Sequence, residues 1–127
     1  MKVFEKEVPY GNPIVSKSYK FALRIVRFYK YYVDKNRKLD AIFKQLLRSG
    51  TSIGANISES QSAFTKKDFI YKLGISLKEA RETEYWLRLL NESNTINNDE
   101  YKSLYNDCEE ISKLLTTIIK SAKQKSK

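Results

Sequence analysis

Three glutamates are the residues whose type and spacing come nearest to a catalytic site. Glu79 and Glu82 are three residues apart and share one face of a helix, and with Glu59 they could ligate a hard cation. The chain contains no histidine, which removes the usual general base near neutral pH and the commonest metal ligand. We therefore favour ion pairs of these carboxylates with basic neighbours over a metal enzyme. The candidate neighbours are Arg48, Arg81 and Lys78. We expect a protein that is not an enzyme and holds no metal or cofactor.

Basic residues form the second group with chemical potential, and they are unevenly distributed. Residues 1–38 hold ten Lys and Arg against three acids, so +7 of the net charge of +9 lies there. Residues 113–127 add five lysines and no acid. Such clustering suits phosphate binding, because each neutralised phosphate releases counterions. The candidate nucleic-acid contacts are Lys17, Lys20, Arg24, Arg27, Lys120, Lys123 and Lys125, with Tyr31 as a ring on which a base could stack.

The same side chains also fit a solvated helix face with one exposed tyrosine, and both interpretations stay open. No Asn or Gln is placed to read base edges, so any binding would favour the backbone or the shape of the nucleic acid. Cys108 is the only cysteine, which excludes an internal disulfide. No apolar stretch is long enough to span a membrane, and the N-terminus lacks an apolar signal core. We expect a cytoplasmic protein with one domain over residues 1–127.

Apolar spacing predicts four helices, at about residues 13–35, 38–60, 66–90 and 98–122, with flexible segments at residues 1–10 and 121–127. Asn12, Thr65 and one of Asn97, Asn98 or Asp99 are the expected N-caps. The predicted buried seam of the first helix is Val15, Tyr19, Ala22, Val26, Tyr29 and Val33, with its basic residues on the opposite face. The predicted seam of the second is Leu39, Phe43, Leu46, Gly50, Ile53 and Ile57.

Two glycines in the second helix are expected to stay helical. Gly50 and Gly54 lie one turn apart, where the missing side chains would let another helix approach closely. The third seam is Phe69, Leu73, Ser76, Ala80, Thr83, Leu87 and Leu90, beside a second strip of Ile75, Trp86 and Leu89. The fourth is Tyr101, Leu104, Cys108, Ile111, Leu115, Ile118 and Ala122. Four such helices with short loops predict an all-α, antiparallel up-down-up-down four-helix bundle, and the surplus apolar strips predict self-association.

The stretch from Ser52 to Ile57 with Glu59, followed by Ser76, Glu79, Ala80 and the run Glu84-Tyr85-Trp86-Leu87, resembles the bacterial 23S rRNA intervening-sequence proteins. The fold is also similar to the accessory variability protein of diversity-generating retroelements, a basic bundle that works with a reverse transcriptase. The resemblance implies a ring-like homo-oligomer, a pentamer, in the cytoplasm. It also implies a polar set between the second and third helices that holds their register. That set is Ser52, Asn56, Glu59, Ser76 and Glu79.

Two functions follow as hypotheses. The first is a non-enzymatic, oligomeric protein that binds RNA or an RNA–DNA duplex through the basic face of its first helix and its C-terminal lysines. The second is a protein-interaction scaffold that docks a reverse transcriptase or another partner that processes nucleic acid.

Overall fold

The computed structural model describes residues 11–125, and these form four long helices and no strand. The helices are α2 (Gly11–Tyr32), α3 (Asp40–Ser60), α4 (Lys66–Glu92) and α5 (Asn98–Lys125). Two single 3-10 turns, Val33–Lys35 and Arg37–Leu39, join α2 to α3. Residues 1–10, residues 126–127 of the tail predicted to be flexible from residue 121, and the side chain of Asn12 lie outside the part of the chain that the structure describes.

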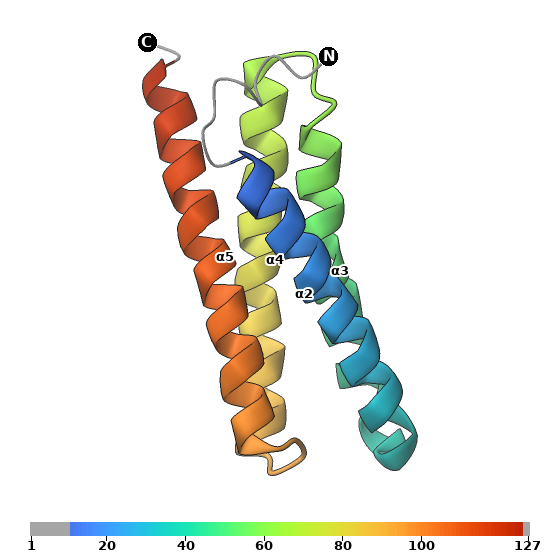
Figure 1. The fold of residues 1–127 in the computed structure, drawn as a ribbon. Helices are drawn as coiled ribbons and strands as arrows, with labels where there is room; N and C mark the ends of the chain where they lie inside the picture. Colours follow the sequence, from blue (N-terminus) through green and yellow to red (C-terminus); the bar gives the residue numbers. More distant parts are fainter. Residues whose placement is uncertain (1–10, 126–127) are drawn as a thin grey trace.

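The helices pack side by side, and each runs opposite to the one before it (Figure 1). Contacts join α2 with α3, α3 with α4, α4 with α5, and α5 back to α2. Short connections between amphipathic helices favour this arrangement, because neighbours in sequence become neighbours in space. The all-α four-helix bundle predicted from the sequence is confirmed.

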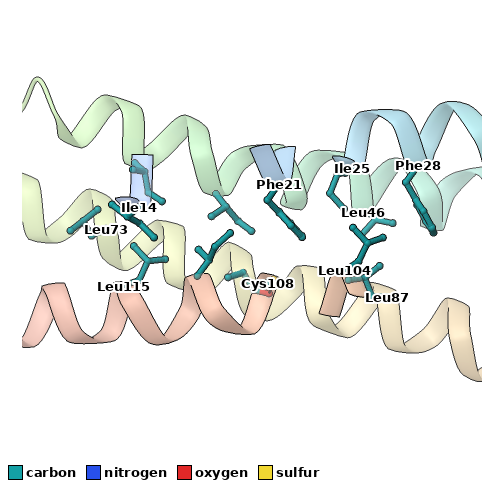
Figure 2. Packing of buried hydrophobic residues seen from close by; sticks show 14 of the residues in the cluster. Ile14, Phe21, Ile25, Phe28, Leu46, Leu73, Leu87, Leu104, Cys108 and Leu115 are labelled. Atoms are coloured by element: carbon teal, nitrogen blue, oxygen red, sulfur yellow. Dashed lines mark hydrogen bonds between the residues drawn. The ribbon is translucent and has the colours of Figure 1, made fainter. Parts of the chain in front are cut away.

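The core consists of aliphatic and aromatic side chains that converge from all four helices (Figure 2). In α4 every residue of the predicted seam is buried, and in α5 every one is buried except Tyr101, which is half-buried. Cys108 is fully buried within the α5 seam, and burial raises the pKa of its thiol well above the usual range. It packs as a small hydrophobe, as predicted, and is not a reactive thiolate.

The predicted seam of α2 is wrong by one position. The buried residues are Ile14, Ser18, Phe21, Ile25, Phe28 and Tyr32. Tyr19 and Val26, which were expected in the core, are exposed. Both strips have helical spacing, so periodicity on α2 alone could not choose between them. The choice depends on the shape of the neighbouring helix.

That shape comes from two glycines of α3, which continues unbroken through both of them. A Cβ built on Gly50 would lie 2.9 Å from Cγ1 of Ile25, and one on Gly54 would lie 3.1 Å from the backbone oxygen of Ser18. The missing side chains therefore admit α2 at the positions of Ser18 and Ile25. Because of this close approach, the strip of α2 that contains Ile25 is the one buried in the core.

Helix ends follow local capping chemistry. The Thr65 hydroxyl accepts a hydrogen bond from the Asp68 amide at 3.0 Å, and the Asn97 side-chain oxygen accepts one from the Glu100 amide at 3.0 Å. At the other end of α5 the prediction of a flexible tail from residue 121 needs correction, since the helix continues to Lys125. Ala122 is buried and continues the seam of α5 by one more turn.

Candidate nucleic-acid interface

The glutamates that could have formed a catalytic site instead surround an arginine. On the α3–α4 face, one Arg48 nitrogen lies 3.2 Å from both carboxylate oxygens of Glu79, and another donates to Glu82. The indole N–H of Trp86 donates to the same Glu82 carboxylate at 3.1 Å. The Trp86 hydrogen bond, followed by those from Arg48, lowers the pKa of Glu82 below its ordinary value. The Glu82 carboxylate is thus held ionised as a partner of Arg48, and Glu79 shares the same guanidinium.

Glu59 lies apart from this pair and binds Lys72 of α4 at 2.8 Å. The three carboxylates considered as metal ligands are therefore not brought together by the fold. Within residues 11–125 no cluster of three His, Cys, Asp or Glu side chains is placed to hold a metal ion.

The polar set expected between α3 and α4 divides into contacts across the helices and contacts within one helix. The Ser76 hydroxyl donates across to the Ile53 carbonyl at 2.7 Å, whereas Asn56 donates to the Ser52 carbonyl of its own helix at 2.9 Å. Glu59 and Glu79 bridge the two helices through the ion pairs above. Sequence reasoning missed one buried bond of this seam, in which the Thr83 hydroxyl donates to that of Ser49 at 2.9 Å. The small size of Ser49, beside Gly50 on the buried face, was the available signal.

The basic side of α2 faces α5 and is partly neutralised there. Lys17 binds Glu110 at 3.1 Å, and Arg24 binds Asp107 at 2.6 Å. These four residues and Lys20 line a shallow pocket between α2 and α5. Lys20 forms no ion pair within the described part of the chain. Sequence reasoning placed these cations opposite the α2 seam and missed their acidic partners, because nothing in α2 itself indicates which face of α5 it meets.

Tyr31, the candidate stacking ring, is 59% exposed, but one face of the ring already has a cation on it. The Lys35 ammonium lies 3.9 Å from the ring centroid, a cation–π geometry. Tyr32 contacts the same ring edge-on, with centroids 4.9 Å apart. A base could reach the ring only at its remaining surface.

Many exposed cations gather at the connection between α2 and α3, which we call the α2–α3 corner. Its members are Arg27, Lys30, Lys35, Arg37 and Lys38. No acid among residues 11–125 forms an ion pair with any of them, and residues 27–38 contain only one acid, Asp34. The corner is therefore a concentrated positive surface that the fold does not neutralise.

A second basic group lies at the opposite end of the bundle, and we call it the lysine end. Its members are Lys66, Lys67, Lys120, Lys123 and Lys125. The beginning of α4 and the end of α5 lie at the same end of the molecule (Figure 1). Because α5 has 28 residues at about 1.5 Å each, roughly 40 Å separates this end from the far end of the helix. The predicted basic surface thus falls into two groups with an acid-lined seam between them.

Two apolar surfaces complete the exterior. A groove of about 520 Å³ runs between α2 and α3, and it is lined by Val15, Tyr19, Ala22, Gly54 and Ala55 among others. On α4 an outer ridge carries exposed Tyr71, Tyr85 and Leu89. No helix in the described part of the chain is long and apolar enough to cross a membrane.

Comparison with known proteins finds a matching family and similar solved structures. The model of the family described as 23S rRNA-intervening sequence protein matches residues 12–117. A crystal structure from Bacteroides thetaiotaomicron, of a protein with unknown function from the S23 ribosomal protein family, is 53% identical to this chain, with a TM-score of 0.83. The similarity covers 87% of this chain and 97% of that one. No curated protein matches the chain. Neither description names an enzymatic activity.

Proposed function

The chain belongs to the family of 23S rRNA-intervening sequence proteins, and on that premise we propose that it is a non-enzymatic, oligomeric protein that binds RNA by its phosphates. The observation that carries the proposal is the division of charge in the bundle. Five acids lie in the seams between helices, where they pair with Lys17, Arg24, Arg48 and Lys72. The cations of the α2–α3 corner are left without acidic partners within residues 11–125.

The cations of the α2–α3 corner are better placed to bind phosphate than the basic face of the first helix, which the sequence suggested. Lys17 and Arg24 must leave carboxylates before they can bind phosphate, whereas Lys20 and the corner cations need not. If all five corner cations each meet a phosphate, the logarithm of the binding constant should fall by about 3.5 to 4.5 per decade of salt. Cations on these helices would contact the phosphate backbone of the nucleic acid and would not read its bases. The protein would therefore bind RNA, or RNA–DNA duplexes, of many different sequences.

Fluorescence anisotropy of a labelled structured RNA, titrated with protein at several salt concentrations, tests the proposal. The variant carries Arg27→Gln, Arg37→Gln and Lys38→Gln, and the expected result is weaker binding with a slope shallower by about 2 to 3. The matched control removes three cations elsewhere on the surface, through Lys78→Gln, Arg81→Gln and Lys102→Gln. Binding that ignores salt, or equal losses in both variants, would show that the corner is not the site.

Self-association is the second part of the proposal, and the two apolar surfaces support it. The groove between α2 and α3 is concave, whereas the α4 ridge projects exposed tyrosine and leucine side chains. A ridge that fills the groove of the next copy makes a contact between two different surfaces, and such contacts close into rings when the rotation allows. The pentamer implied by the family resemblance is an assembly of this kind.

Light scattering on variants of each surface distinguishes this arrangement from a two-fold dimer. Val26→Glu beside the groove and Leu89→Glu on the ridge should each break the ring. In a mixture of the two variants, the intact ridge of one can still fill the intact groove of the other. The mixture should therefore give heterodimers. If Leu89→Glu leaves the assembly unchanged, the ridge is not the partner of the groove.

The alternative function is a scaffold that docks a reverse transcriptase or another partner that processes nucleic acid. The apolar groove favours it, because a partner helix could occupy the same surface as a second copy. The RNA titration separates the alternatives. If the wild-type protein stays folded and oligomeric but binds no RNA at any salt concentration, the scaffold becomes the better account.

A further inference from the structure

Phe64 is the most exposed large hydrophobic residue of the described chain, with 98% of its surface accessible. It lies in the connection between α3 and α4 and has no aromatic or cation contact within residues 11–125. The other exposed rings differ in this respect, since Tyr31 carries Lys35 on its face and Tyr85 packs edge-on against Trp86. A phenylalanine this exposed contributes almost no apolar burial to the fold, and its ring is open to a ligand.

The backbone that carries Phe64 is held on both sides. Before it, the Ser62 amide donates to the Glu59 carbonyl at 3.0 Å, and the Ala63 amide donates to the Ser60 carbonyl at 3.2 Å. After it, Thr65 caps α4 through the Asp68 amide at 3.0 Å. These hydrogen bonds fix the connection, so little conformational freedom remains to be lost when the ring meets a ligand.

The surroundings of the ring are basic. Lys66 and Lys67 follow it directly, and the α5 members of the lysine end lie at the same end of the bundle (Figure 1). The register of α4 against α5 accounts for this, because the Cys108 thiol meets the Ala80 carbonyl at 3.4 Å and the antiparallel helices continue from there. Among residues 11–125, Glu59 near this end is paired with Lys72, and Asp68 is the acid of the first turn of α4.

We propose that Phe64 is a stacking platform for an unpaired base, and that the lysine end holds the phosphates on either side of that base. The proposal rests on the RNA-binding function above and adds a single-stranded segment as the ligand of this end. An aromatic ring beside clustered cations is the usual arrangement for binding single strands, since every base offers a flat face and every nucleotide a phosphate. Anchors of protein interfaces sit instead in an apolar setting that excludes water, and the sequence neighbours of Phe64 are Ala63 and the polar Thr65.

The test compares Phe64→Ala, Phe64→Leu and Phe64→Trp in anisotropy titrations with a labelled 12-nucleotide single-stranded RNA. Loss of one stacked base should weaken binding about 5- to 150-fold in the alanine variant. Leucine should weaken it similarly, because it keeps the apolar volume but has no ring, and tryptophan should retain or improve the affinity.

An abasic strand of the same length separates stacking from phosphate binding. The difference between wild type and Phe64→Ala should disappear on it, because only phosphates remain to be bound. Full affinity of Phe64→Ala or Phe64→Leu for the normal strand overturns the stacking site, and in that case salt-dependent binding by the wild type leaves the proposed function standing. Wild-type protein that binds neither the single strand nor the structured RNA overturns both.

Discussion

Replacing Gly50 with alanine tests the close contact of α2 and α3, and the same replacement at Gly74 provides the control. Both residues lie inside helices, where alanine is favoured over glycine by about 1 kcal/mol. A Cβ on Gly74 would meet nothing within 4 Å, so the full gain is expected there. At Gly50 the added atom would lie 2.9 Å and 3.0 Å from the two γ carbons of Ile25.

Ile25 cannot easily move away from the new atom. Carbon atoms are in favourable contact at about 3.5 to 4.0 Å, so a shift of about 0.5 to 1 Å is needed. The Ile25 side chain is completely buried and branched at Cβ, which leaves it little rotamer freedom. Overpacking of this kind costs about 1 to 3 kcal/mol. Since the gain in helix propensity is common to both sites, Gly50→Ala should be less stable than Gly74→Ala by about 1 to 3 kcal/mol.

Urea denaturation followed by helical circular dichroism measures this difference, with all variants at one protomer concentration because assembly contributes to apparent stability. The double variant Ile25→Ala, Gly50→Ala provides a second check, since the alanine at position 50 then enters a cavity and should be tolerated better than in the wild-type background. If Gly50→Ala is as stable as Gly74→Ala, the argument that the α3 glycines select the buried strip of α2 is refuted.

Three further variants test the polar contacts. Asp107→Asn combined with Glu110→Gln frees two α2 cations. RNA affinity should rise, and the slope of log affinity against log salt should become steeper by about 1.4 to 1.8. Unchanged anisotropy titrations would show that these cations do not reach RNA. Ser76→Ala removes the hydrogen bond to the Ile53 carbonyl and should lower the free energy of unfolding in urea by about 1 kcal/mol. Burial raises the pKa of Glu84, so its ionised form opposes folding at neutral pH. Glu84→Gln should therefore raise the melting temperature at pH 7 and lose that advantage near pH 3.5, below the ordinary glutamate pKa of about 4.3; an equal effect at both pH values would contradict the assignment.

The sequence predicts α4 and α5 better than α2 for a physical reason. In α5 the heptad from Leu104 to Ala122 is the dominant apolar strip, so its spacing leaves no competing assignment for the buried face. In α2 a strip through Val15 and Val26 competes with one through Ile14 and Ile25, and both have helical spacing. The decision is made by glycines of another helix, which is information that periodicity within one helix does not contain.

The contacts of the candidate site were also only partly predictable from the sequence. The pairing of Arg48 with Glu79 and Glu82 could be predicted, because their positions on adjacent helices and their opposite charges agree. The pairing of Arg24 with Asp107 could not, because it depends on how α2 and α5 meet across the bundle. The bare ring of Phe64 also escaped prediction, since sequence alone does not tell an exposed phenylalanine in a connection from one that folds back onto the core.

The placement of charge separates cations that serve the fold from cations that do not. Each inter-helix ion pair is partly exposed and worth only about 0.2 to 1 kcal/mol, so the pairs adjust helix register and do not hold the core together. The corner cations repel one another, and no acid among residues 11–125 compensates them by an ion pair. Salt should therefore affect RNA affinity and folding stability differently. At about 0.5 M salt, where phosphate contacts are strongly screened, RNA binding should be lost while the midpoint of urea denaturation stays nearly constant. Parallel loss of stability and binding would mean that the ion pairs contribute more to the fold than their exposure implies.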